Sequence, residues 1–131
     1  MNVPLSPRVL IADDDDANRE VLSYYLRRQG FEVCTVASGA EAIDALESGT
    51  FAMLLLDVVM PEMDGLETLR RIRTRFTPAM LPVILFTGLE SDETLHAARA
   101  LGANGCLPKP YQLSELLEAI RGQLTEPKAL R

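Results

Sequence analysis

The chain has 131 residues, of which 47% are hydrophobic and 24% are charged, and this length and composition fit one globular domain. The hydrophobic fraction excludes disorder, and two cysteines are too few for a disulfide scaffold. The longest uninterrupted apolar run, from Phe51 to Leu56, is six residues long, whereas a membrane-spanning helix needs about 20. Residues 1–7 lack the basic start and apolar stretch of a signal peptide. We therefore expect a cytoplasmic protein with no membrane contact.

Thirteen basic and 19 acidic side chains give the chain a formal net charge of −6. Direct nucleic-acid binding is not expected, because such a surface needs Lys and Arg to replace counterions. Part of the acidic excess lies in one run, Asp13 to Asp16. Composition leaves two interpretations of this run open. It is either a solvated turn before a helix N-terminus, whose dipole favours acidic residues, or a site for a divalent cation.

Short apolar segments typical of buried parallel strands alternate with longer segments of helical spacing. Gly30 is a good end for the first helix, and a capping box from Ser38 to Glu41 opens the second. The predicted strands are 8–12, 31–36, 51–56, 82–86 and 105–107. The predicted helices are 16–29, 38–47, 64 to about 75, 91 or 92 to about 102, and 113–124. We expect one domain over residues 8–124, with tails at 1–7 and 125–131.

Five strand–helix units predict a doubly wound α/β fold, with a parallel sheet covered by helices on both faces. In such folds the ligand site lies beyond the carboxyl ends of the strands. The first and third strands deliver Asp13, Asp14 and Asp57 to that edge. The fourth and fifth strands deliver Thr87 and Lys109.

This set of side chains points to phosphoryl chemistry with a metal ion. Three close carboxylates need a cation to stay ionised, and Mg²⁺ prefers a few carboxylates together with waters and phosphate oxygens. A hydroxyl and an amine can bind the remaining oxygens of a phosphoryl group, and a carboxylate can itself be the nucleophile that forms an acyl phosphate. An EF-hand is excluded, because its ligands alternate along a single loop.

The motifs together resemble the receiver domain of two-component response regulators, and in particular the single-domain chemotaxis-type receivers. The resemblance covers about residues 8–124. It implies a flavodoxin-like three-layer α/β/α fold with the strand order 2-1-3-4-5. The matching segments are Leu10 to Asp15, Leu55 to Gly65, Phe86-Thr87-Gly88 and Pro108-Lys109-Pro110-Tyr111.

The resemblance also implies a role for each acidic residue. Asp57 would be the phosphoacceptor. Asp13 and Asp14 would hold Mg²⁺ together with Asp57 and the backbone carbonyl of Val59. A second Asp two residues after the nucleophile is usual in aspartyl-phosphate hydrolases, the rival enzyme class, and here that position is Val59.

For the remaining residues, the resemblance implies that Thr87 is the switch hydroxyl and that Lys109 pairs with the phosphoryl oxygens. Lys109-Pro110 matches the family's cis-peptide position. The implied partners are a histidine kinase or a histidine phosphotransfer protein, and a downstream protein target. We expect a monomer or weak dimer that turns over no separate substrate. The complete set of acidic residues, Thr and Lys argues against a pseudo-receiver that acts without phosphorylation.

One position departs from the family pattern. Cys106 stands where receivers usually carry Tyr or Phe, whose ring moves inward as the switch Thr shifts, and a cysteine is too small to act in this way. Tyr111 is a candidate substitute, although its position is normally one of packing.

Two further expectations follow from the strand order and the family pattern. Cys34 and Cys106 would lie at opposite edges of the sheet, roughly four strand spacings or about 19 Å apart, and so would not form a disulfide. Val59 and Leu89 flank the line along which water attacks the phosphoryl group, and neither can orient a water, so the phosphoryl group is expected to be long-lived. The sequence leaves open whether the receiver acts alone or belongs to a larger chain such as a hybrid kinase.

Overall fold

The computed structural model describes residues 6–88 and 92–125. Leu89 and the helix cap proposed at Ser91 lie outside the described residues. The strands are β1 (Arg8–Ala12), β2 (Glu32–Val36), β3 (Met53–Asp57), β4 (Val83–Thr87) and β5 (Gly105–Pro108). The helices are α1 (Asp16–Arg28), α2 (Gly39–Ser48), α3 (Gly65–Ile72), α4 (Asp92–Ala100) and α5 (Leu113–Thr125). All strand pairs are parallel and follow the order β2-β1-β3-β4-β5, which confirms the predicted fold class and strand order.

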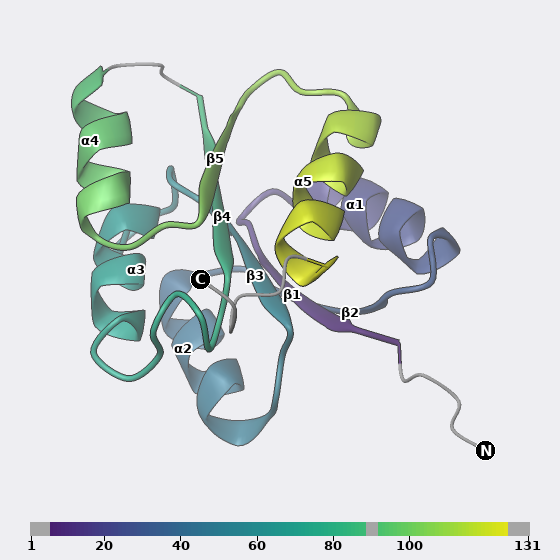
Figure 1. Ribbon diagram of the computed structural model, residues 1–131, viewed down its shortest axis with the longest axis horizontal. Helices are drawn as coiled ribbons and strands as arrows, with labels where there is room; N and C mark the ends of the chain where they lie inside the picture. Colours follow the sequence, from purple (N-terminus) through teal and green to yellow (C-terminus); the bar gives the residue numbers. More distant parts are fainter. Residues whose placement is uncertain (1–5, 89–91, 126–131) are drawn as a thin grey trace.

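The sheet forms the middle layer of three. Helices α1 and α5 cover one face, and α2, α3 and α4 cover the other (Figure 1). Successive strand side chains point to opposite faces, so Leu54 and Leu56 of β3 join one core while Met53 and Leu55 join the other. All residues of β3 and β4 are buried. This burial on both faces explains why these strands read as continuous apolar runs in the sequence.

The start of α2 agrees with the sequence prediction, whereas the end of α3 differs from it. The Ser38 hydroxyl accepts a hydrogen bond from the Glu41 amide at 3.1 Å, and the Glu41 carboxylate accepts one from the Ala37 amide at 2.8 Å. The capping box therefore forms, although the return bond reaches one residue further back than in the standard motif. Helix α3 ends at Ile72 rather than near residue 75, and the chain continues through turn-type backbone bonds over 73–76.

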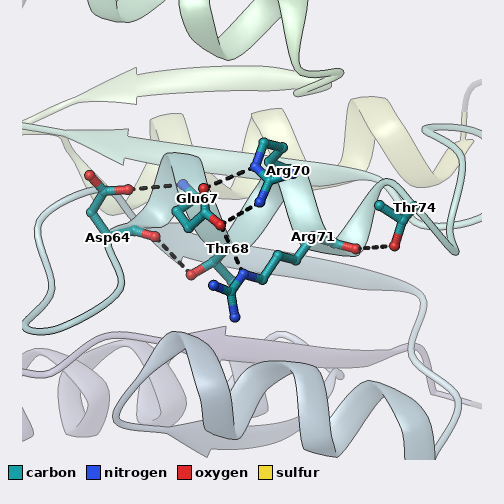
Figure 2. Close-up of polar contacts among 6 residues, drawn as sticks. All are labelled: Asp64, Glu67, Thr68, Arg70, Arg71 and Thr74. Carbon is teal, nitrogen blue, oxygen red and sulfur yellow. Dashed lines mark hydrogen bonds and ion pairs between the residues drawn. The ribbon is translucent and has the colours of Figure 1, made fainter.

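The start of α3 is fixed against the strand that carries Asp57. The Asp64 side chain caps the helix by accepting a hydrogen bond from the Glu67 amide at 2.9 Å (Figure 2). The next residue, Gly65, donates its amide to the Val58 carbonyl at 2.8 Å. A Cβ at this position would collide with the Asp57 carbonyl oxygen and lie 2.7 Å from the Val58 Cα. Glycine is therefore required, because the helix begins directly against the carboxyl end of β3.

The two cysteines lie in the edge strands. Cys34 belongs to β2 and Cys106 to β5, and both are free thiols, as predicted. Within residues 6–88 and 92–125, no helix has the length and apolar character needed to cross a membrane.

Candidate functional site

The parallel register gathers the predicted polar residues at one edge of the sheet. Asp13 directly follows β1, Asp57 ends β3, Thr87 ends β4 and Lys109 follows β5. Asp57 is paired in register with Phe86, the residue before Thr87. The exposed fractions of Asp13, Asp57 and Thr87 are 0%, 3% and 1%. Buried polar side chains need partners or a ligand, so this edge is the candidate functional site.

Three carboxylates meet at this edge. Asp13, Asp14 and Asp57 each offer an oxygen, and these oxygens all lie within 4.8 Å of one another. Asp14 is exposed, whereas the other two are buried. A cluster of hard oxygen donors with one side open to solvent suits Mg²⁺, which keeps several waters when it binds proteins. The residues present therefore fit the expected metal.

Lys109 supplies a positive charge beside the cluster. Its Nζ lies 2.8 Å from Oδ2 of Asp57, within both hydrogen-bond and ion-pair distance. The backbone positions this side chain, because the Lys109 amide donates to the Thr87 carbonyl at 2.7 Å and so extends the pairing of β4 and β5. The lysine and the phosphoacceptor candidate, which are 52 residues apart in sequence, are thereby brought into contact.

The environment of Asp57 opposes its ionisation. Burial raises the pKa of the Asp57 carboxyl above its ordinary value, and the negative charge of Asp13 adds to the rise. The hydrogen bond and the charge of Lys109 act in the opposite direction, and so does a bond from the Val59 amide at 3.3 Å. The pKa remains raised overall. A cation bound among the carboxylates would favour the ionised form.

Three contacts that the sequence did not reveal hold Asp13. The Asn18 side-chain amide donates to Oδ2 of Asp13 at 2.7 Å, and the Asp15 amide donates to Oδ1 at 2.9 Å. The guanidinium of Arg19 donates to the Asp13 backbone carbonyl at 2.6 Å and also pairs with Asp16. The position of Asn18 in the first turn of a helix that follows an acidic run was the available signal for its role.

Thr87 is a buried site residue whose side chain has no hydrogen-bond partner among the residues that the structure describes. Its Oγ1 is the buried side-chain polar atom that lacks a hydrogen bond within the described part of the chain. Leaving a buried hydroxyl unbonded costs about 1–3 kcal/mol. This hydroxyl is therefore free to bind a group that enters the site.

A cavity of about 490 Å³ lies beside Cys106, between β5 and α4. Thr87 and Arg99 are among its lining residues, and burial raises the pKa of the Cys106 thiol. Tyr111 cannot fill this space, because its ring packs on the opposite face of the sheet. There it stacks on Phe86 with centroids 5.0 Å apart. The suggestion that Tyr111 substitutes for the missing aromatic is therefore wrong.

Val59 lies beside the acidic cluster with 66% of its surface exposed. An exposed apolar side chain at this position offers no group that could orient a water toward Asp57. Leu89, the second residue expected to flank the phosphoryl group, is not among the described residues.

In a comparison with protein families, residues 9–121 match the family described as the response regulator receiver domain. The chain belongs to this family. Receiver domains are the phosphoacceptor modules of two-component systems, and the acidic edge of the sheet fits that role.

Individual relatives agree with this assignment. Response regulator MprA of Mycobacterium bovis is 40% identical over 124 residues, which make up 95% of this chain and 53% of MprA. The chain thus spans about half the length of this relative. A CheY-like receiver domain protein from Methanospirillum hungatei has a TM-score of 0.88 and 31% identity, over 96% of this chain and 99% of its own. Response regulator TrrA from Thermotoga maritima, solved in complex with Mg²⁺–BeF, has a TM-score of 0.80 and 30% identity, over 90% and 99%.

Proposed function

We propose that Asp57 receives a phosphoryl group from a phosphohistidine of a sensor kinase or of a histidine phosphotransfer protein. The observation that carries this proposal is the position of Asp57. It is a buried carboxylate at the end of β3, in contact with Lys109 and within 4.8 Å of two further carboxylates. Such a group is both a nucleophile and part of a cation site.

Asp13, Asp14 and Asp57, together with the backbone carbonyl of Val59, would hold Mg²⁺. When bound, the ion would offset the negative charge of the carboxylates and of the phosphoryl oxygens. The complex of TrrA with Mg²⁺–BeF supports this choice of metal.

In the transfer step, an oxygen of Asp57 attacks the phosphorus atom. The new O–P bond forms as the N–P bond of the donor breaks, and the bonding electron pair stays on the imidazole nitrogen. Lys109 already contacts Oδ2 of Asp57, so its ammonium group is placed to bind a phosphoryl oxygen once the acyl phosphate forms. The unpartnered hydroxyl of Thr87 would bind a second oxygen, and its movement would alter the surface near α4.

The proposal extends to the remaining properties expected from the sequence. Residues 8–124 act as one receiver domain that assists its own phosphorylation and dephosphorylation but turns over no separate substrate. A downstream protein recognises the phosphorylated form, and the receiver itself is a cytoplasmic monomer or weak dimer without direct contact to nucleic acid. Hydrolysis of phosphate esters by the purified protein would identify an aspartyl-phosphate hydrolase instead.

The test is phosphorylation by a small donor such as acetyl phosphate, followed by mass spectrometry. We expect one phosphoryl group on the wild type in Mg²⁺ and none on Asp57→Asn or after chelation of the metal. Asp64→Asn is a matched control, because Asp64 lies in the segment between β3 and α3 and caps α3, and Asn caps equally well. Labelling of Asp57→Asn at the wild-type rate, or labelling that is indifferent to chelator, would contradict the proposal.

A further inference from the structure

Asn18 connects helix α1 to the acidic cluster. Its Nδ2 lies 2.7 Å from Oδ2 of Asp13, a side chain with no exposed surface. Its own backbone amide donates to Oδ1 of Asp15, the N-cap residue of α1, at 3.4 Å. Asn18 is thus held by the helix start at one end while it holds Asp13 at the other.

The two oxygens of Asp13 are each engaged once. Oδ1 accepts from the Asp15 amide at 2.9 Å, and Oδ2 accepts from Asn18. A carboxylate oxygen has two lone pairs, so each oxygen retains one for a cation. Both donors belong to the start of α1, and bonds to both oxygens restrain the rotation of the carboxylate. The orientation that places an Asp13 oxygen near Asp14 and Asp57 is fixed before any ligand arrives.

The chemistry of the donor matters as much as its position. Asn18 is neutral, so it stabilises the charge of Asp13 without adding a cation that would compete with a metal for the same oxygens. Lys109 plays the contrasting part at Asp57, where an ammonium group lies 2.8 Å from the carboxylate. A lysine at position 18, in addition to Lys109, would place a positive charge at the Asp13 carboxylate, where it would compete with a metal ion.

We propose that Asn18 is a positioning residue that sets the affinity of the site for Mg²⁺ by fixing the carboxylate of Asp13. This inference rests on the proposed function, because it takes Asp13, Asp14 and Asp57 as the metal's protein ligands. Groups that orient a metal ligand typically change metal affinity by about 10–100-fold when they are removed. Replacement of Asn18 by Ala should therefore weaken Mg²⁺ binding by about that factor.

The experiment is a calorimetric titration of the metal-free protein with MgCl₂ alone, accompanied by thermal unfolding with and without Mg²⁺. Asn18→Ala should keep the fold, because Ala has a higher helix propensity than Asn. Val21→Ala is the matched control. It truncates an exposed side chain in the same helix without changing charge, and its Kd for Mg²⁺ should equal that of the wild type.

A Kd for Asn18→Ala that is at least tenfold weaker than the wild-type value, beside an unchanged Val21→Ala, supports the inference. An unchanged Kd for Asn18→Ala, with or without a lower unfolding temperature, overturns it and leaves the proposed function intact. If the wild type itself binds no Mg²⁺, the metal part of the proposed function and this inference both fail.

Discussion

Buried polar groups have opposite environments at the amino and carboxyl ends of strands β3, β4 and β5. At the amino ends, the partly buried guanidinium of Arg73 finds an acceptor for each of its nitrogens. At the carboxyl ends, the Thr87 hydroxyl has no partner, and burial raises the pKa of Asp57. The acceptors of Arg73 are the carbonyls of Phe76, Leu81 and Gly102 and the side chain of Asn104, at 2.9–3.0 Å.

The contrast between the two ends indicates that one contributes to the stability of the fold and the other to the functional site. A buried polar group contributes to stability when its bonds are satisfied and opposes it when they are not. The Arg73 cluster (Arg73 with its four acceptors) joins the end of α3 to the segments that lead into β4 and β5. The acidic edge instead leaves polar groups with part of their bonding capacity unused. Asp13 and Asp57 have donors in the protein, whereas the Thr87 hydroxyl would gain a partner only from a group that enters the site.

The largest effect on stability is expected at the Arg73 cluster. Arg73→Ala removes the donor of three carbonyls and one of the two donors of the Asn104 side chain, and should lower the free energy of unfolding by about 3 kcal/mol. Burial lowers the pKa of Arg73 to about 10, so the side chain is still charged at neutral pH. Urea unfolding measures the change. Arg71→Ala, an exposed arginine of the same helix, is the control and should stay within about 0.5 kcal/mol of the wild type. If Arg73→Ala and Arg71→Ala lowered the free energy of unfolding equally, the bonds of Arg73 would not be a special source of stability at the amino ends of the strands.

The next largest effect concerns water at the acidic edge. Val59→Asn combined with Leu89→Glu introduces polar groups that can orient a water, and the phosphoryl group on Asp57 should then decay up to about 10²-fold faster. Val59→Ala keeps the position apolar and should change the decay little. The measurement is the loss of labelled Asp57 with time in Mg²⁺. A double variant that decays no faster than the wild type would show that apolar side chains do not set the lifetime.

The smallest effect is expected for three bonded side chains at the surface of α3, Glu67, Arg70 and Arg71. Hydrogen bonds from Arg70 and Arg71 lower the pKa of Glu67 to about 2 (Figure 2). A carboxyl whose pKa is depressed by folding adds stability above its unfolded pKa of about 4.3, and loses it as the pH falls toward 2. Because the Glu67 side chain is 35% exposed, solvent screens this contribution. NMR titration should show the Glu67 pKa near 2 in the wild type and closer to 4.5 in Arg70→Ala. A value that does not move would show that Arg70 is not its main partner.

Much of the fold and the geometry of the site followed from local patterns. The apolar run at 8–12 and the glycine at position 30 mark element ends that the structure keeps within one or two residues. Once the parallel order is given, register alone places Asp57, Thr87 and Lys109 at one edge.

The features that the sequence did not reveal depend on side-chain reach across the fold. Helix α3 stops at Ile72 while the Arg73 side chain bonds to carbonyls as far along the chain as Gly102, a contact that no periodicity indicates. The contact of Asn18 with Asp13 depends on the angle at which α1 leaves β1. The face on which Tyr111 packs depends on the path of the chain after β5, which the spacing of residues does not specify.

The stack of Tyr111 on Phe86 has an optical consequence. The chain contains three tyrosines and no tryptophan, so its intrinsic fluorescence comes from tyrosine alone. Burial raises the pKa of Tyr111 to about 12, and the charges of Asp13 and Asp57 add to the rise. Tyr24, with 65% of its surface exposed, supplies a solvent-facing reference. The difference in fluorescence between the wild type and Tyr111→Phe therefore gives the emission of Tyr111, a ring beside the site, without an added dye.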